Sequence, residues 1–143
     1  MRISTKGRYS LEAMLFLALS PVDEYLSTRR ISEATGISEG YLEQLFILLR
    51  KASLIVGTRG PQGGYALARK SEAISVGEIL IAVEHSLAPV ACLVDHSCPS
   101  EKSCLSRSVW DLLYKEITAC VDSILLSDIA ISFTLQEEGE VHI

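Results

Sequence analysis

This sequence lacks long apolar runs and clusters of catalytic residues, and it has only three histidines. No stretch of eighteen apolar residues occurs, so we expect no membrane-spanning helix. The apolar run that follows the basic N-terminus is interrupted by Glu12, which argues against a secretory signal. We find no Ser/His/Asp constellation, phosphate-binding loop or carboxylate pair at catalytic spacing. The sequence therefore predicts a cytoplasmic protein that is not an enzyme, binds no membrane and has no small-molecule substrate.

The chain also has no net positive charge, because its 13 lysines and arginines are outnumbered by 18 acidic residues, which gives a net charge of −5. The two halves of the chain differ, however. Residues 1–70 carry ten basic and six acidic residues, a balance of +4, and residues 71–143 carry three and twelve, a balance of −9. A basic front half on an acidic back half indicates that one face of the protein meets phosphate.

Two short helices joined by a tight turn are predicted within residues 27–51. Ser27 or Thr28 can cap a first helix that runs to Thr35, with Ile31 and Ala34 on its inner face. Gly36 suits the left-handed position that ends such a helix, and Ser38 caps the next one. The second helix has apolar residues at helical spacing, namely Leu42, Leu45, Phe46 and Leu49. This arrangement predicts a helix-turn-helix.

The second helix of this motif has side chains that can read DNA. Its first turns carry Ser38, Gly40, Tyr41, Glu43 and Gln44, and in a helix-turn-helix these positions meet base edges in the major groove. Gln44 can pair with adenine through two hydrogen bonds, and Glu43 can accept one from cytosine while disfavouring wrong sites. An ordinary helical hairpin with a solvated face is the alternative interpretation.

A β-hairpin is predicted directly after this helix, from two β-prone runs at 54–58 and 65–67. A hairpin in this place is a wing, and an arginine at its tip can enter a narrow minor groove. Glycines in the turn let the backbone approach the sugar-phosphate chain closely. The expected contacts are Arg59, Gly60, Pro61, Gly63 and Gly64. Glycine and proline are common in any hairpin turn. The prediction of a wing therefore rests on the order of the elements, a helix-turn-helix followed directly by a hairpin with a basic tip.

Helices are also expected on both sides of this region. Residues 7–20 form a first amphipathic helix with apolar positions Leu11, Met14, Leu15, Ala18 and Leu19. Arg2 and Lys6 precede or open it and can contact phosphate, although a solvated, frayed terminus would look the same. Ser75 caps a further helix over residues 76–83.

Three cysteines, Cys92, Cys98 and Cys104, follow with five residues between each pair. Proline, serine and charged residues fill the gaps, so we expect a loop that can fold three thiolates around one soft metal centre. A metal-free thiol switch, or a zinc site that uses His96, would use the same residues. A small electron carrier is a third interpretation, but it leaves the wing and the basic front half unexplained.

One long helix is predicted after the cysteine loop, over residues 105–126, with no helix breaker. Its apolar residues form one stripe: Leu105, Val109, Leu112, Leu113, Ile117, Cys120, Val121 and Ile124. A small domain cannot cover so much apolar surface, so we expect the same helix of a second copy to cover it. The division into domains is then 1–85 for DNA binding, 86–104 for the cysteine loop, 105–130 for dimerisation and 131–143 for a flexible acidic tail.

The chain resembles a family of winged helix-turn-helix transcriptional regulators typified by IscR, NsrR and CymR. Residues 1–9, 37–46, 59–65 and 76–80 and the three cysteines carry the resemblance, which extends from residue 1 to about 130 and is strongest to IscR-like members. It implies a mainly α fold with a small β-hairpin wing and a homodimer on a palindromic promoter site. It also implies a repressor of the genes for iron–sulfur cluster biogenesis.

In IscR-like members three cysteines and a histidine hold a [2Fe-2S] cluster, and the histidine position is Arg107 here. Arginine stays protonated and is a poor ligand. NsrR-like members hold a [4Fe-4S] cluster with an acidic residue of the partner chain near position 8, which is Arg8 here. Glu12, one helical turn on, is a candidate fourth ligand beside Cys92, Cys98 and Cys104. The overall pattern favours [2Fe-2S] over [4Fe-4S].

Overall fold

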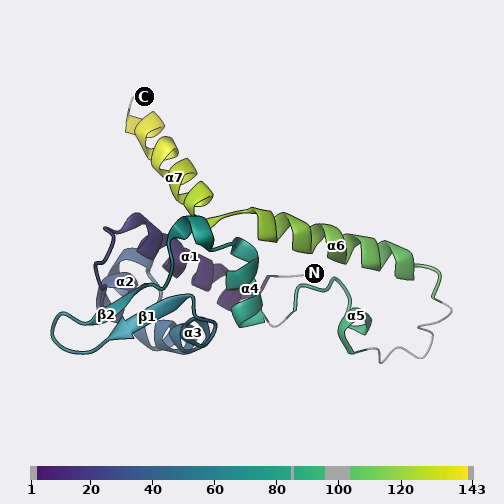
Figure 1. The fold of residues 1–143 in the computed structure, drawn as a ribbon, viewed down its shortest axis with the longest axis horizontal. Coiled ribbons are helices and arrows are strands. Elements are labelled where there is room, and N and C mark those ends of the chain that lie inside the picture. Colours follow the sequence, from purple (N-terminus) through teal and green to yellow (C-terminus); the bar gives the residue numbers. More distant parts are fainter. Residues whose placement is uncertain (1–2, 85, 96–103, 142–143) are drawn as a thin grey trace.

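The computed structural model describes residues 3–84, 86–95 and 104–141, which form helices and one antiparallel hairpin (Figure 1). This is the mainly α fold with a small wing that the sequence predicted. The elements are, in order, α1 (Thr5–Leu19), α2 (Thr28–Thr35), α3 (Glu39–Lys51), β1 (Ile55–Thr58), β2 (Gly64–Leu67), η1 (Ser71–Ala73), α4 (Val76–Glu84), α5 (Cys92–Asp95), α6 (Arg107–Ser123) and α7 (Leu126–Val141). None of the helices in this described part combines the length and apolar content needed to cross a bilayer.

The helix-turn-helix forms as predicted, with α2 and α3 joined at Gly36. The Ser27 side chain accepts a hydrogen bond from the backbone N–H of Arg30 at 3.1 Å, and Ser38 accepts one from Tyr41 at 3.3 Å. Gly36 has φ 78°, which a residue with a Cβ adopts at a cost. The apolar face of α3 is buried to 1% exposure or less, at Leu42, Leu45, Phe46 and Leu49. Ala34 is exposed, so its predicted place on the inner face of α2 is wrong.

The first helix, α1, lies in the middle of the molecule and contacts α2, α3, α4 and α7. For this reason it has no single apolar stripe. Met14 is buried as expected, but Leu19 is 42% exposed, and several of the buried residues are small. The buried residues of α1 are Gly7, Ser10, Ala13, Met14 and Leu17. A central helix of this kind holds the helix-turn-helix on one side and the C-terminal half on the other.

A capping box opens α4. The Ser75 hydroxyl accepts a hydrogen bond from the N–H of Glu78 at 3.1 Å, and the Glu78 carboxylate accepts one from the N–H of Ser75 at 3.0 Å. Arg69 also contacts this carboxylate, at 3.2 Å. Ser75 therefore caps α4 as predicted, and the segment after the wing is tied to the start of the helix.

The long helix expected over residues 105–126 is interrupted, which corrects the prediction. It ends at Ser123, and Ile124 is extended, with φ −88° and ψ 116°. Two backbone hydrogen bonds replace the helical ones: Val76 N–H donates to Ile124 O and Leu126 N–H to Ile74 O, both at 2.8 Å. The Asp128 carboxylate then accepts from Leu125 N–H at 3.1 Å and caps α7. The chain therefore exchanges helical hydrogen bonds for pairing with the strand-like residues before α4.

Two other segments differ from the expected loops. Helix α7 continues to Val141, so residues 131–141 of the predicted flexible acidic tail are helical. The cysteine segment begins with one helical turn, α5. Both helices α6 and α7 extend away from the body of the molecule (Figure 1).

Candidate nucleic-acid interface and cysteine segment

The outer face of α3 carries the side chains predicted to read bases. Gly40, Glu43 and Gln44 are exposed, and Ile47, one helical turn further on, is 62% exposed. Ser38 is exposed, but its hydroxyl is used as the helix cap. Tyr41 is half-buried, and its ring meets Tyr9 of α1 edge-on, with centroids 5.6 Å apart and an interplanar angle of 81°. Tyr41 therefore also anchors α3 to α1.

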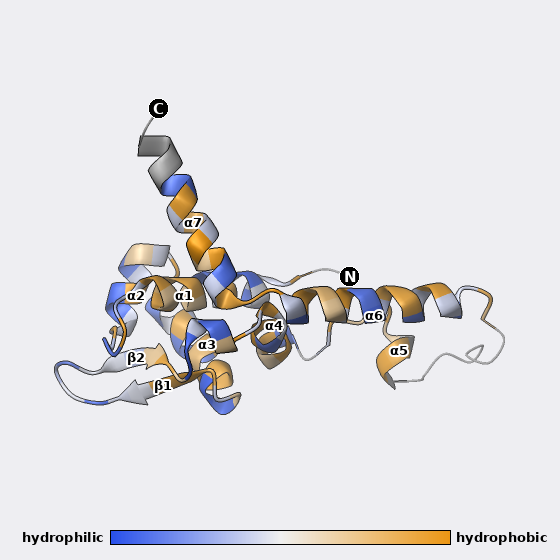
Figure 2. Ribbon diagram, turned by 45° about the horizontal axis from the view of Figure 1, so that its top comes forward, coloured by the Kyte–Doolittle hydropathy of each residue, from blue (hydrophilic) through white to orange (hydrophobic). Residues whose placement is uncertain are grey.

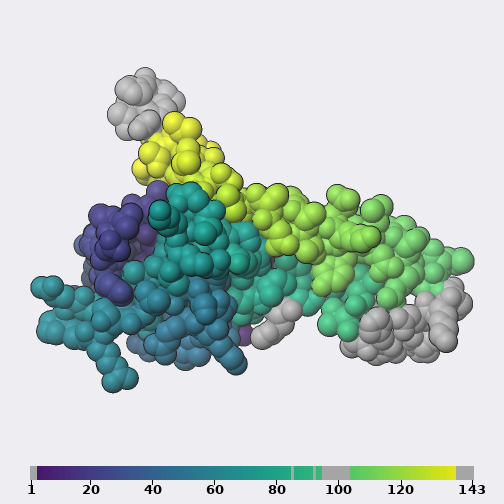
Figure 3. Space-filling model, in the orientation of Figure 1, coloured from purple at the N-terminus to yellow at the C-terminus, as the bar shows by residue number. Residues whose placement is uncertain are grey.

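The wing projects from the body beside α3 (Figure 3). Its strands pair in the register Ile55↔Leu67 to Thr58↔Gly64, and Arg59, Gly60 and Pro61 are exposed at the tip. Gly60 has φ 108°, which suits the turn. The fold itself also requires Gly63 and Gly64, because a Cβ would lie 2.5 Å from the carbonyl oxygen of Thr58 at Gly63 and 2.2 Å from that of Leu26 at Gly64. Their close approach to DNA stays a prediction.

The wing is bonded to the helix-turn-helix at two places. Leu26 N–H donates to Tyr65 O at 2.9 Å, and Tyr65 N–H donates to Leu26 O at 2.7 Å. The Tyr65 ring also packs on Phe46 of α3, with centroids 4.5 Å apart. These contacts fix the position of the Arg59 turn relative to α3.

A hollow of about 730 Å³ lies between the start of α2, the end of α3 and the wing. Two arginines line it, Arg50 from the last turn of α3 and Arg59 from the wing, together with the hydroxyls of Ser27, Thr28 and Thr58. The sequence analysis did not single out Arg50 as a candidate contact. Its position in the last turn of α3, where a basic residue also suits the helix dipole, could have indicated it.

Most basic side chains of the N-terminal half have no acidic partner within the described part of the chain. Arg29 pairs with Glu33 and Arg69 with Glu78, each at 3.2 Å. The cations without such a partner are Lys6, Arg8, Arg30, Arg50, Lys51, Arg59 and Lys70. Lys6 is exposed in the first turn of α1, and Arg2 lies outside the described residues. These cations can therefore bind anions without first breaking ion pairs.

The predicted cysteine ligands are only partly within the described structure. Cys98 and His96 lie outside it, as does the side chain of Cys92 at the start of α5. Cys104 is half-buried, and Glu12 is exposed on α1. Within the described ranges, no three His, Cys, Asp or Glu side chains gather as a metal site. The ligand set of the sequence analysis therefore stays a prediction.

The surroundings of Cys104 favour its thiolate. Its sulfur lies 3.5 Å from the Ser106 hydroxyl, and hydrogen bonds from Ser106, followed by the nearby charge of Arg107, lower the pKa of this thiol. Arg107 itself is directed to Asp111, with Nε 3.6 Å from the carboxylate oxygen. A guanidinium held in this way adds positive charge near the cysteine and offers no lone pair.

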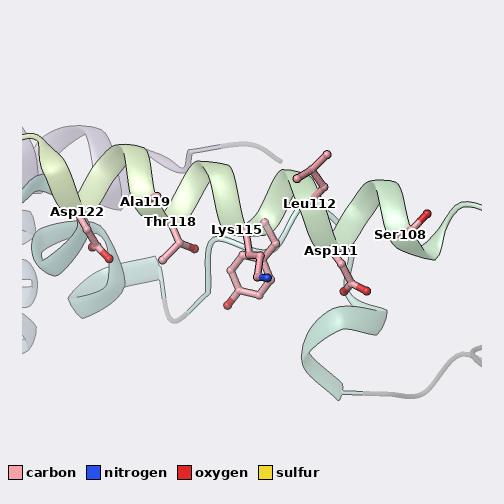
Figure 4. A pocket seen from close by; sticks show the side chains of 8 residues that line it. Ser108, Asp111, Leu112, Lys115, Thr118, Ala119 and Asp122 are labelled. Atoms are coloured by element: carbon pink, nitrogen blue, oxygen red, sulfur yellow. The ribbon is translucent and has the colours of Figure 1, made fainter.

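The apolar stripe of α6 is packed in its C-terminal half and exposed in its N-terminal half. Ile117 and Val121, with Ile124 just after the helix, pack on a small cluster formed with α4, whereas Val109, Leu112 and Leu113 are 50%, 58% and 41% exposed. Figure 2 shows the hydrophobic colouring along α6 and α7, and the exposed large apolar residues of α7 are Ile131, Phe133 and Leu135. A shallow hollow of about 830 Å³ lies along α6, and Asp111, Lys115, Thr118 and Asp122 point to one side of the helix there (Figure 4).

Comparison with known proteins agrees with this arrangement. The family model Rrf2, described as an iron-dependent transcriptional regulator, matches residues 3–131. The transcriptional regulator IscR of Yersinia pestis is 40% identical over 129 residues, which cover 90% of this chain and 79% of that protein. Two solved structures are also similar: CymR, the global cysteine regulator of B. subtilis, with 37% identity, TM-score 0.72 and coverage of 92% and 98%, and T. potens IscR, with 36% identity, TM-score 0.73 and coverage of 100% and 92%.

These relatives are transcriptional regulators and not enzymes, and they share the wing, the helix-turn-helix and the C-terminal helices over nearly the whole chain. The sequence identities of 36% to 40%, over 90% or more of this chain, are too high for a likeness of fold alone. The chain belongs to the Rrf2 family of DNA-binding transcriptional regulators.

Proposed function

We propose that this protein is a homodimeric repressor that binds a palindromic promoter site and senses iron–sulfur clusters through Cys92, Cys98 and Cys104. We further propose that it acts in the cytoplasm on genes of iron–sulfur cluster biogenesis. The observations that carry the DNA-binding part are the exposed polar face of α3 and the cations on α1, α2, α3 and the wing that have no acidic partner among the described residues. Similarity to IscR proteins supports the sensing part.

In this proposal α3 enters the major groove and the wing enters the neighbouring minor groove. Gln44 reads adenine and Glu43 selects against wrong bases. Arg59 enters the minor groove, and the hollow beside it, lined by Arg50 and three hydroxyls, accommodates the sugar-phosphate chain. Half-sites one helical turn apart are expected for a two-fold dimer.

The second copy is proposed to pack on the exposed apolar residues of α6 and α7. Among the described residues, the exposed large apolar side chains of these two helices are Val109, Leu112, Leu113, Ile131, Phe133 and Leu135, and the exposed Leu105 comes just before α6. An isologous contact along paired helices would bury them and set the distance between the two α3 helices.

The three cysteines would hold the cluster, and their thiolates suit iron. When bound, the cluster supplies a redox-sensitive and removable cross-link within the segment. Arg107 supports the view that the ligand set differs from that of IscR-like proteins, because its side chain is engaged with Asp111. Glu12, exposed on α1, is the proposed fourth ligand, and [2Fe-2S] is favoured over [4Fe-4S].

The test is anaerobic purification followed by iron and sulfide quantification, visible spectroscopy and selection of DNA duplexes from a randomised library. We expect iron and sulfide in equal amounts, near two of each per chain, on the basis of the [2Fe-2S] type, and an enriched palindrome. Glu12→Ala should lose cluster while Glu24→Ala should keep it. A protein without iron or a charge-transfer band would remove the cluster from the proposal, and a library without enrichment would remove DNA binding.

A metal-free thiol switch is the second candidate. Two observations favour it: the lowered pKa of the Cys104 thiol beside Ser106 and Arg107, and the similarity to CymR, a global cysteine regulator. In this case the metal-free, reduced protein would bind DNA, and peroxide would change its affinity reversibly with dithiothreitol. Iron with matching sulfide in the purified protein would exclude this candidate.

A further inference from the structure

The last residue of α4, Glu84, is bonded to the N-terminal end of α1, eighty residues away in the sequence. Its carboxylate oxygen accepts hydrogen bonds from Ser4 N–H at 2.9 Å, from the Ser4 hydroxyl at 2.5 Å and from Gly7 N–H at 3.2 Å. Ser4 is the N-cap of α1. One half-buried carboxylate therefore satisfies two N-terminal amides of α1 and places negative charge where the helix dipole favours it.

The contact depends on a glycine. A Cβ added at Gly7, which is buried, would lie 2.4 Å from the Glu84 carboxylate oxygen and 2.9 Å from Ile3. Any side chain at this position would therefore push the carboxylate away from the amides. Gly7 and Glu84 form a matched pair across the joint between α1 and α4.

An apolar contact lies beside this polar one. Leu87, three residues after Glu84 and only 3% exposed, clusters with Val76 and Leu80 of α4, and Ile3 and Leu11 pack against them. The chain then continues to Cys92 at the start of α5. The segment that leads to the first cysteine thus starts beside the N-terminal end of α1, with Glu84 bonded to that end and Leu87 in the cluster against which Ile3 and Leu11 pack.

The other side of the same helical turn faces solvent. Lys6 is exposed there, between Ser4 and Gly7, and it has no acidic partner among the described residues. The position of this cation depends on the first turn of α1, and that turn is held by Glu84.

We infer that Glu84 is a positioning residue that holds the first turn of α1 for phosphate contact and links it to the state of the cysteine segment. This inference rests on the proposed DNA-binding function and deepens it. Glu84 itself does not contact DNA. A shift of residues 86–95, caused by loading or oxidation of the cysteines, would reach α1 through this carboxylate.

The test is a double-mutant cycle on DNA affinity, using the metal-free, reduced protein and the duplex that the wild type enriches from a randomised library. We expect Glu84→Ala and Gly7→Ala each to weaken DNA binding about tenfold. Because both changes break the same contact, the double variant should have a DNA affinity no lower than that of the single variant with the lower affinity. Glu84→Gln should lie between them and the wild type, because its amide oxygen still accepts hydrogen bonds. The exposed control Glu24→Ala should bind like the wild type.

A second measurement separates positioning from loss of stability. If the Lys6 contact is lost, the slope of log affinity against log salt should fall by about one, whereas a folded protein that is merely less stable keeps the slope. Thermal unfolding and sedimentation confirm that each variant is folded and has the oligomeric state of the wild type at the assay temperature. Wild-type affinity and slope in Glu84→Ala would overturn the positioning role.

The link to the cysteines is tested by the ratio of DNA affinities between metal-loaded or peroxide-treated protein and the metal-free, reduced protein. We expect this ratio to differ from one in the wild type and to approach one in Glu84→Ala. A variant that keeps the wild-type ratio, or a wild type without any difference, overturns the link. A wild type that enriches no duplex overturns the proposed function as well, so the two failures are distinguishable.

Discussion

Gly40 and Gly64 are two glycines of the DNA-binding half whose surroundings differ completely. An added Cβ at Gly64, which has φ 151°, would lie 2.2 Å from Leu26 O, whereas at Gly40 it would meet nothing within 4 Å. We expect Gly64→Ala to destabilise the fold by roughly 2 kcal/mol or more, because backbone must move. Gly40→Ala, the matched control, should keep or raise the unfolding midpoint and instead weaken DNA binding. Equal thermal midpoints for the two variants would contradict this account.

Arg59 is exposed at the tip of the wing and lines the same hollow as Arg50. Arg59→Ala should weaken DNA binding by about 1–3 kcal/mol and lower the salt slope by about one, with the dimer intact. Lys70→Ala removes the same charge after β2, where Lys70 lines a different hollow beside residues 20–25, and should change affinity little. Fluorescence anisotropy at several salt concentrations measures both, and unchanged binding in Arg59→Ala would remove the wing from the interface.

The Cys104 thiol has its pKa lowered first by the hydrogen bond from Ser106 and further by the charge of Arg107. A lowered pKa means that the reactive thiolate is already present at a pH where an ordinary thiol is protonated. Alkylation of metal-free protein by iodoacetamide, followed at Cys104 by mass spectrometry, should therefore begin at lower pH than for a free thiol. Ser106→Ala should move the onset to higher pH, and Ser108→Ala, its control, should not. An identical onset in Ser106→Ala would contradict the assigned cause.

At the scale of single elements, α4 depends on the reciprocal bonds between Ser75 and Glu78. Ser75→Ala should lower the free energy of unfolding by about 1 kcal/mol, the usual cost of losing a serine cap. Ser71→Ala is a suitable control, because its hydroxyl makes only a 3.4 Å contact with Glu72 at the exposed η1. Chemical denaturation followed by circular dichroism measures both. If the two variants are equally stable, the box does not hold α4.

The elements that the sequence predicted well are those with local chemical signals. Ser27, Gly36 and Ser38 mark the ends of α2 and α3 through their own side-chain or backbone preferences. The break at Ile124 has no such signal, since no glycine or proline is there. It forms because residues 74 and 76 offer backbone partners, and such pairing depends on the tertiary fold.

At the scale of the whole molecule, the exposed apolar residues of α6 and α7 predict a dimer. Leu112→Glu would place a charge at the centre of that surface, and we expect it to give a monomer by light scattering and to lose binding to a palindromic duplex. Val22→Glu, at a valine that is 90% exposed between α1 and α2, is the control and should remain dimeric. A dimeric Leu112→Glu protein would place the contact elsewhere.

The candidate site was predictable where function follows from sequence order, and not where it follows from packing. The roles of Arg59 and Gln44 could be predicted because a recognition helix followed by a basic-tipped hairpin has a known relation to the two grooves, and both roles stay predictions. The bond of Glu84 to Ser4 and Gly7 joins residues about eighty positions apart, and no periodicity reports it. The use of Gly63 and Gly64 for packing was likewise visible only in three dimensions.

The two hydrogen bonds between Leu26 and Tyr65, together with the Phe46–Tyr65 ring contact, hold the wing at one position relative to α3. We therefore expect the fold to set the distance between the bases that α3 would read and the base pairs that Arg59 would touch. In the proposed complex, one base pair inserted between these two positions should weaken binding to that half-site. We expect operators of different length to differ only in the spacer between the half-sites, where two copies could rotate relative to one another.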